Sequence, residues 1–519
     1  MGTERTQFST LETDLSRSAI TVPEEFLFGV ANSGYQVEGG YNQPGCPYNN
    51  FARWELSGRV ERTGDACNFW SRYQDHIDLA SSLGLNAFRM GIEWARVQPS
   101  FHERVSTPPP FDELALDGYT AILDRITGSG MTPIVTLHHF THPAWCGVDL
   151  WLQEGMACLF IEYAVEVVRR INERLVLRGR APLVHLVTLN EPNVLPLVTY
   201  MVGEHPHGRW GFAAARTAMD TMLLAHVLLY DRIHDLYEQQ GWPRPIVTFN
   251  TFSTAIYEFD RAFFDLVRAP SSGVDRRSLK DYLAMHRRNW NQKFDELSLS
   301  RWGRFSYSRR HFKNYRFVCS LLFDPLNMKR TIEALYASSR KEKLDAIALD
   351  IYDPFVIGAP YFRVPRPGTH DPIFRPQWWD WHHDPEHFST VLRAHNDSNF
   401  GLPLYILETT LAHRQKYRGS AIPRRDSQGR GEFLRWSIQE VLKAIHENIP
   451  VMAYCYWSLT DNYEWGTFEP RLGLYEYDYE IGRIKDRSGL GEDAGGLYKN
   501  IVTSLRKRDP DWIRTYLAQ

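Results

Sequence analysis

The sequence predicts one α/β domain, a (β/α)8 (TIM) barrel with long loops after its strands. Short apolar runs rich in β-branched residues alternate with longer amphipathic stretches, as in successive βαβ units. No linker and no internal repeat divides the chain. The apolar runs number eight, which favours a closed parallel barrel over an open sheet. The strands are expected at 26–31, 86–92, 132–139, 184–190, 245–251, 344–351, 403–408 and 450–457.

Helical periodicity fills most of the intervals between these strands. It is clearest at 71–83, 114–129, 156–178, 211–239, 329–339 and 430–448. We expect residues 1–22 to form a polar N-terminal extension and 23–519 to form the barrel domain. The largest departure from a minimal barrel is an enlarged loop region at about 252–328, between the fifth and sixth strands.

Composition excludes several functional classes. The chain has 519 residues and a formal net charge of −3, so no global field favours nucleic acid or an anionic membrane. Residues 1–22 lack the apolar core of a signal peptide, and no run approaches the roughly 18 apolar residues of a membrane span. The six cysteines lack C-x-x-C spacing and are expected to be free thiols, which favours a cytoplasmic location. The oligomeric state stays open, a homo-oligomer included.

Polar and aromatic side chains follow every predicted strand. Because parallel strands of a barrel end at the same rim, these side chains should converge there. A single carboxylate at a strand end is more often a cap or an ion-pair partner, but a whole ring of polar side chains favours an active site. The residues are Gln36, Arg89, His138, His139, Asn190, Glu191, Asn250, Asp350, Tyr352, Glu408 and Trp457, followed by Asp461, Asn462, Glu464 and Trp465.

Two of these residues, Glu191 and Glu408, form the pair of carboxyl groups that hydrolysis of a glycosidic bond requires. One carboxyl must be protonated to release the leaving oxygen, and the other must be ionised. At a separation of about 5–5.5 Å the ionised group attacks the sugar directly and configuration is retained, whereas a wider gap predicts inversion. Arg89 and Tyr352 can support an ionised Glu408, which makes Glu408 the expected nucleophile and Glu191 the acid/base. This chemistry requires no cofactor and no metal.

At these positions the chain resembles glycoside hydrolase family 1, the β-glucosidase family, from about Phe26 to the C-terminus. Thr188-Leu189-Asn190-Glu191-Pro192 is similar to the family's acid/base motif, and residues 88–96 and 347–352 resemble its second- and sixth-strand segments. The resemblance implies that Glu191 is the acid/base and Asn190 contacts the sugar 2-hydroxyl. It also implies that Arg89 and Tyr352 flank the nucleophile.

Three further segments, 26–40, 136–140 and 457–465, resemble the family's sugar-binding motifs. By this resemblance Gln36 and His139 bind sugar hydroxyls, Trp457 stacks on the ring, and Glu464 and Trp465 bind its far hydroxyls. Residues 381–386 look like the loop before the seventh strand. The cluster of His382, His383 and Asp384 is therefore expected to be loop structure rather than a metal site.

The chain also departs from the family pattern. Leu407-Glu408-Thr409-Thr410 stands where Thr-Glu-Asn-Gly is usual, Asp350-Ile351 stands where Asn-Tyr is usual, and residues 466–471 are atypical. These changes bear on efficiency and sugar preference more than on the type of reaction.

The expected function is that of a retaining exo-β-glycosidase for β-D-glucosides, with β-galactosides and β-fucosides as further candidates. A carboxylate at Glu464 would repel a 6-phosphosugar. The basic, aromatic segment 301–317 is expected to be a solvated loop or a wall for a bulky apolar aglycone, with contact to anionic lipid or single-stranded nucleic acid as minor alternatives. Two alternatives remain: a transglycosidase that uses the same covalent intermediate, and a non-catalytic sugar-binding protein, which the altered residues after Glu408 would suit.

Overall fold

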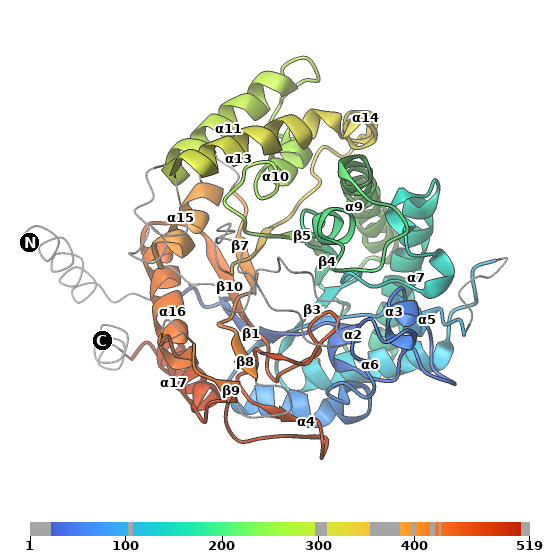
Figure 1. Cartoon of the computed structure of the whole chain (residues 1–519), viewed down its shortest axis with the longest axis vertical. Helices are drawn as coiled ribbons and strands as arrows, with labels where there is room; N and C mark the ends of the chain where they lie inside the picture. Colours follow the sequence, from blue (N-terminus) through green and yellow to red (C-terminus); the bar gives the residue numbers. More distant parts are fainter. Residues whose placement is uncertain are drawn as a thin grey trace, which may run out of the picture.

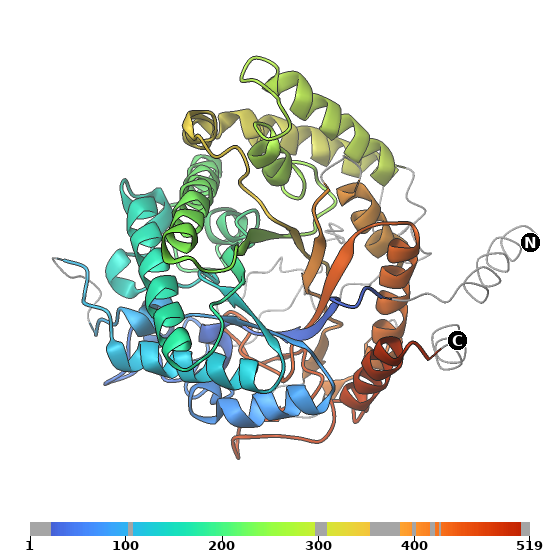
Figure 2. The ribbon, with the colours of Figure 1, turned by 180° about the vertical axis from the view of Figure 1, so that it is seen from behind.

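The core of the protein is a closed barrel of eight parallel strands, in the order β1-β2-β3-β4-β5-β6-β7-β10 around the barrel. The computed structural model describes residues 22–101, 107–295, 309–352, 385–396, 401–415, 421–424 and 427–509. Figures 1 and 2 show the strands at the centre with the helices around them. The barrel strands are β1 (Leu27–Ala31), β2 (Ala87–Gly91), β3 (Thr132–Thr136), β4 (His185–Asn190), β5 (Ile246–Phe252), β6 (Ile347–Asp350), β7 (Leu404–Glu408) and β10 (Val451–Trp457).

The first strand closes the barrel by pairing on both sides. Gly29 of β1 lies opposite Ala87 of β2 and opposite Cys455 of β10, both in parallel register. The (β/α)8 fold predicted from the sequence is thus confirmed. The predicted third strand runs beyond the observed end of β3 at Thr136, although the carbonyl of His138 still accepts a hydrogen bond from the Asn190 N–H at 2.8 Å.

Long helices cover the outside of the barrel and bury one apolar face each. In α7, for example, Phe160, Tyr163, Val167 and Ile171 are spaced by three or four residues and are buried. At the start of α6 the side chain of Asp112 caps the helix by accepting the Ala115 N–H. The helices outside the β5–β6 connection are α4 (Phe69–Ser82), α6 (Glu113–Gly128), α7 (Met156–Leu177), α9 (Phe212–Gln240), α15 (Pro385–His395), α16 (Arg430–His446) and α17 (Ala494–Lys507), with the short α2 (Gly34–Val37), α3 (Ala52–Leu56), α5 (Trp94–Val97) and α8 (Leu195–Leu197).

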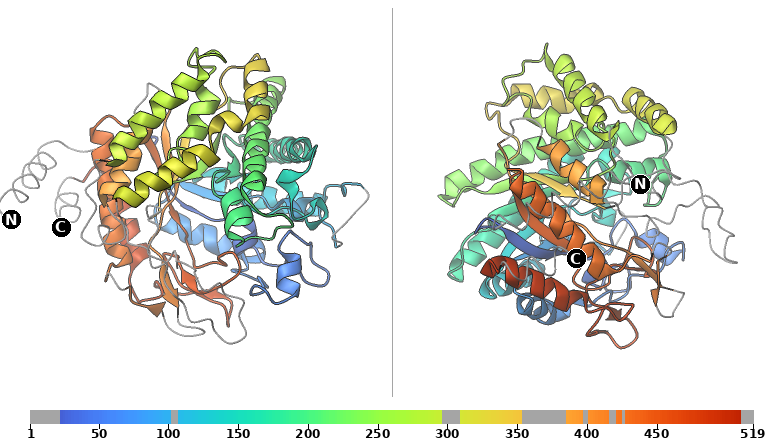
Figure 3. Two further views of the ribbon diagram at one scale, coloured as in Figure 1. Left: turned by 45° about the horizontal axis from the view of Figure 1, so that its top comes forward. Right: turned by 90° about the vertical axis from the view of Figure 1, so that its left-hand side faces the viewer.

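The connection between β5 and β6 carries several helices where the sequence suggested an enlarged loop region. They are α10 (Ala262–Arg268), α11 (Leu279–Asp295), α13 (Arg309–Leu322) and α14 (Lys329–Ala337). Helices α11 and α13 lie side by side at one edge of the molecule (Figures 1 and 3), and Arg316 of α13 donates a hydrogen bond to the Asn291 side chain of α11. The part of segment 301–317 from Arg309 onward is therefore helical rather than a loop, while 301–308 lie outside the described residues.

Helix α9 is the one described helix that is long and apolar enough to cross a membrane. Of the most apolar 18-residue stretch of this helix, 61% is buried inside the protein. There α9 packs against α7 and α14. A core helix of a barrel has the same properties, so α9 is explained by its packing.

Two small antiparallel sheets follow the barrel's last strands. One is formed by β8 (His413–Gln415), β9 (Ala421–Ile422) and β11 (Pro470–Arg471), and the other by β12 (Tyr477–Asp478) and β13 (Arg483–Ile484). Strand β11 pairs with β8, which follows β7, and so ties the segment after β10 to the segment after β7. The barrel strand β10 before it and the sheet strand β11 after it fix the two ends of 458–469, the stretch that carries Glu464 and Trp465.

Candidate active site

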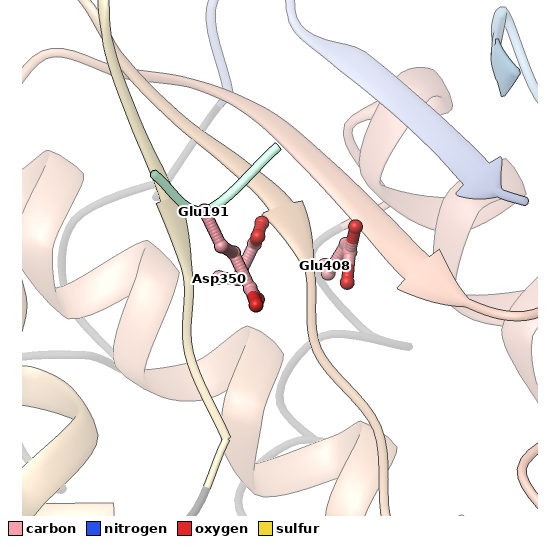
Figure 4. Close-up of side chains that lie close together, drawn as sticks. All are labelled: Glu191, Asp350 and Glu408. Atoms are coloured by element: carbon pink, nitrogen blue, oxygen red, sulfur yellow. The ribbon is translucent and has the colours of Figure 1, made fainter. Parts of the chain in front are cut away.

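Glu191 and Glu408 face each other at the carboxyl ends of the strands. Glu408 is the last residue of β7, and Glu191 directly follows β4. One carboxylate oxygen of each, together with one of Asp350, lies within 4.8 Å of the others, and all three residues are buried (Figure 4). This separation falls below the ~6.5–9.5 Å at which a water fits between two catalytic carboxyls, and it suits direct attack on the sugar.

Two donors hold the carboxylate of Glu408. Arg89 Nη1 donates to Oε1 at 2.5 Å, and the Tyr352 hydroxyl donates to Oε2 at 2.7 Å. Burial raises the pKa of Glu408 above its ordinary value, while the charge of Arg89 and the hydrogen bond from Tyr352 oppose the rise. Both oxygens are thus oriented by donors, as an attacking carboxylate requires.

Asn190 lies next to this ion pair with a fixed amide orientation. Its Oδ1 accepts one hydrogen bond from Arg89 Nη2 at 2.6 Å and another from Asn250 Nδ2 at 2.7 Å. Because the oxygen is used twice within the protein, the NH2 group of Asn190 is the donor that remains for a ligand.

Glu191 has an unusual backbone conformation and a shifted pKa. Its φ of 43° is in the left-handed region, which costs a non-glycine residue free energy and is common at functional sites. Its N–H donates to the Asn250 carbonyl at 3.0 Å, which holds this conformation. Burial, and then the charges of Asp350 and Glu408, raise the pKa of Glu191 well above its ordinary value. Glu191 is therefore protonated where an ordinary glutamate would be ionised.

An aromatic wall adjoins the carboxylates. The His139 ring stacks on Trp457 at 5.5 Å and on Trp465 at 5.8 Å. Burial and the nearby Arg89 charge hold the pKa of His139 well below its ordinary value, so its imidazole is neutral and can exchange hydrogen bonds with hydroxyls. Flat rings beside neutral and acidic hydrogen-bonding groups are suited to a sugar ring.

Glu464 and Gln36 complete this wall. Trp457 Nε1 donates to Glu464 Oε1 at 3.1 Å, and burial raises the pKa of Glu464 to about 8. Gln36 is fully buried, and its Nε2 donates to the Tyr463 carbonyl at 2.9 Å. Behind them, Asp461 accepts the Gly473 N–H at 3.0 Å and a hydrogen bond from Arg471, which anchors the segment.

The structure brings all ten residues predicted from the sequence to one rim of the barrel. Contacts or electrostatic interactions connect them in one group: Gln36, Arg89, His139, Asn190, Glu191, Tyr352, Glu408, Trp457, Glu464 and Trp465.

Two further residues belong to the site and were not assigned a role from the sequence. Asp350, the last residue of β6, is a third carboxyl beside Glu191 and Glu408, and Asn250 of β5 donates to it. Both were recognised as polar residues at strand ends. Their positions at strand ends predicted that both lie at the rim of the barrel. Position alone does not show which side chains contact Glu191 and Glu408.

The three carboxyl oxygens are numerous enough for a hard cation. However, Arg89, Tyr352 and Asn250 direct N–H or O–H groups at these oxygens, and Arg89 already supplies a positive charge. Donor hydrogens and a cation would compete for the same lone pairs, so the arrangement fits proton chemistry better than metal binding. His382, His383 and Asp384 lie outside the described residues.

A barrel with two facing carboxyls at this separation defines the class of retaining glycoside hydrolases. Comparison with known proteins agrees: the profile of glycosyl hydrolase family 1 matches residues 18–269 and 334–505. The chain belongs to glycosyl hydrolase family 1 and is a glycosyl hydrolase, retaining as in this family.

Its relatives include Beta-glucosidase A of Thermotoga maritima, which is 25% identical over 92% of this chain and 97% of the relative. Another is the Bifunctional beta-D-glucosidase/beta-D-fucosidase of Bifidobacterium breve, 27% identical over 94% of this chain and 99% of the relative. Among solved structures, the family 1 b-glucosidase from T. maritima has a TM-score of 0.65 at 22% identity and covers 93% of this chain and 98% of its own.

Proposed function

We propose that this protein is a retaining exo-β-glycosidase for β-D-glucosides, with Glu408 as the nucleophile and Glu191 as the acid/base. The observation that carries the proposal is that a carboxyl oxygen of Glu191 lies within 4.8 Å of a carboxyl oxygen of Glu408. The retaining mechanism of the family and the β-glucosidase activity of the relatives support it.

In the first step, a Glu408 oxygen attacks the anomeric carbon while Arg89 and Tyr352 hold the carboxylate in place. The bond from this carbon to the aglycone oxygen breaks, and Glu191 gives its proton to that oxygen. The raised pKa of Glu191 keeps this proton available at neutral pH. The products are the free aglycone and a glycosyl ester on Glu408.

In the second step, water attacks the same carbon from the opposite face. Glu191, now ionised, takes a proton from the water, and the ester bond to Glu408 breaks. While the ester exists Glu408 carries no charge, so one cause of the raised pKa of Glu191 is absent and Glu191 can act as a base. Two inversions at one carbon restore the β configuration.

The sugar is assigned to the wall formed by Gln36, His139, Trp457, Glu464 and Trp465. We infer that the two tryptophans pack on the ring while Glu464 and Gln36 bind its far hydroxyls, and that Asn190 donates to the 2-hydroxyl. Because the B. breve relative is also a beta-D-fucosidase, β-fucosides are candidate substrates here, and β-galactosides are a further candidate.

An apolar aglycone is inferred on the acid/base side. The segment after Glu191 exposes Val202, Trp210 and Phe212, with 55%, 61% and 44% of their surfaces accessible. Its His205 ring lies 5.2 Å from Trp465, which places this segment next to the sugar wall. A bulky apolar leaving group would cover these side chains.

We assign residues 1–22 to an extension and 23–519 to the barrel domain. All six cysteines are free thiols in the structure, which supports a reducing, cytoplasmic location.

The test is turnover of p-nitrophenyl β-glucoside, β-galactoside and β-fucoside, with proton NMR of the first sugar released. We expect the β-anomer to appear first and the glucoside or fucoside to be preferred. First appearance of the α-anomer would contradict retention. Binding of sugars without turnover of any glycoside would contradict the enzymatic proposal, and added alcohol acceptors would reveal transglycosylation as new glycosides.

Glu464→Gln is expected to lower kcat/KM for the glucoside near pH 7 by about 2- to 12-fold, because burial raises the pKa of Glu464 to about 8 and a hydrogen bond between neutral groups contributes ~0.5–1.5 kcal/mol. The loss should be smaller for a glycone that lacks the hydroxyl that Glu464 binds. Above about pH 8, where Glu464 is ionised, wild type should also reject a 6-phosphoglucoside, and Glu464→Gln should reject it less strongly. An equal loss on every glycone would argue against a hydroxyl-binding role.

A further inference from the structure

We propose that Asp350 is a positioning residue that shares a proton with Glu191 and thereby holds the acid/base in its acidic form. The inference rests on the proposed function of Glu191. It concerns the third carboxyl of the site, which the two-carboxylate mechanism does not use.

The backbone places Asp350 beside both catalytic carboxyls. Asp350 ends β6 directly opposite Glu408 of β7 in the strand register. Its side chain is completely buried and lies within hydrogen-bond reach of Glu191 (Figure 4). Asn250 donates to Asp350 Oδ2 and also accepts the Glu191 N–H through its carbonyl. One residue of β5 therefore aligns both members of the Glu191–Asp350 pair.

A proton between these two groups would satisfy a buried oxygen of Asp350, which lies within 4.8 Å of a Glu191 oxygen. Among the described residues, Asp350 Oδ1 has no amide, hydroxyl or guanidinium donor, although it is buried. Two ionised carboxylates offer only acceptors, so they can form a hydrogen bond only if one of them is protonated. The Glu191 carboxyl is the neighbour that can supply this O–H group.

The proton belongs mainly to Glu191. The charge of Asp350, after burial, raises the pKa of Glu191. Burial and the charge of Glu408 also raise the pKa of Asp350, but Arg89 and the hydrogen bonds from Glu191 and Asn250 oppose the rise. Asp350 therefore has the better-stabilised anion and accepts the hydrogen bond.

The surrounding groups set the charge balance of the pair. Arg89 of β2 is the cation, Glu408 of β7 is the other anion, and the neutral groups are Tyr352, His139 and Cys455 of β10. Three ionised carboxyls against one guanidinium would leave two uncompensated buried charges. Keeping one proton on the Glu191–Asp350 pair removes one of them.

This arrangement has a consequence for catalysis. The charge of Glu408 disappears when the sugar is attached, but the charge of Asp350 persists through both steps. Glu191 therefore keeps its proton to higher pH during the first step and stays a stronger base toward water in the second. An asparagine at position 350, which the family pattern favours, would carry no charge and could not act in this way.

The experiment compares Asp350→Asn with wild type in the pH dependence of kcat/KM for an alkyl β-glucoside, whose poor leaving group needs the acid. Removing the charge lowers the pKa of Glu191, so the alkaline limb should move to lower pH by about one pH unit or more. The acidic limb should move less. An unchanged alkaline limb in an active Asp350→Asn enzyme would overturn the proposal.

Tyr352→Phe is the matched control, because it removes the hydrogen bond that the Tyr352 hydroxyl donates to Glu408 and leaves the charge of Asp350 in place. It should move the acidic limb to higher pH and leave the alkaline limb in place. Asp350→Glu keeps the charge and should keep the wild-type alkaline limb even if its kcat is lower. An alkaline limb in Asp350→Glu that moves as far as in Asp350→Asn would show a purely steric role.

A double-variant cycle tests whether Asp350 acts through Glu191. With 2,4-dinitrophenyl β-glucoside, which needs no acid, adding Asp350→Asn to Glu191→Gln should change the rate of the first step by less than about twofold. A further large loss would contradict action through Glu191. Loss of wild-type activity with EDTA, restored by Ca²⁺, would make the three carboxyls a cation site and also overturn the proposal. If the wild-type protein turned over no glycoside at all, that result would instead refute the proposed function itself.

Discussion

Glu408→Gly is expected to lower kcat for p-nitrophenyl β-glucoside by about 10⁴- to 10⁶-fold, the range for loss of a catalytic nucleophile. No other described carboxylate is held by both Arg89 and Tyr352, so no neighbour can take over the attack. Azide should enter the space left by the side chain and restore turnover. Because it attacks from the face that Glu408 occupied, the product should be the α-glucosyl azide, which NMR identifies.

Glu440→Gln is the control for this variant. Glu440 is a buried glutamate on α16, paired with Lys443 and outside the site, so its replacement should change kcat little. Circular dichroism should show native folding for both variants. Formation of the β-azide, or residual activity within tenfold of wild type, would assign the nucleophile elsewhere.

Glu191→Gly should show a loss that depends on the leaving group. For an alkyl β-glucoside the first step needs the acid, and we expect a loss of about 10²–10⁴-fold. For 2,4-dinitrophenyl β-glucoside the first step should be nearly normal, and the glycosyl-enzyme should accumulate because no base activates water. Burst kinetics would reveal this accumulation.

Azide distinguishes the two glutamates by stereochemistry. In Glu191→Gly it should attack the glycosyl-enzyme from the face that water normally uses and give the β-glucosyl azide. The normal dependence of rate on pH above neutrality should also disappear, because the group with the raised pKa is gone. An equal loss on both substrates would show that Glu191 supports the site without transferring a proton.

Much of this site was predictable because strand-end positions are encoded locally. Apolar runs that stop at Glu191 and Glu408 show in the sequence itself, and closure of a parallel barrel then brings such positions to one rim. The eight predicted strands lie close to the observed ones for the same reason.

Properties that depend on distances between strands could not be predicted. The contact of Asp350 with Glu191 depends on the register of β6 against β7 and on the left-handed turn at Glu191. The helices α11 and α13 were not foreseen, and in α13 the aromatic and basic side chains of segment 301–317 concealed the periodicity. In this insertion Arg316 of α13 binds Asn291 of α11, and α11 also packs on α10 and α15, contacts between segments that are far apart in the sequence.

The most direct test of the central claim is to trap the intermediate. 2,4-Dinitrophenyl 2-deoxy-2-fluoro-β-glucoside slows both steps, but its good leaving group lets the first step proceed, so a glycosyl-enzyme should accumulate. Mass spectrometry of a protease digest should then find the fluoroglucosyl mass on a peptide that contains Glu408, with Glu408 as the modified residue. A label on any other residue, or inactivation of Glu408→Gln at the wild-type rate, would contradict the account.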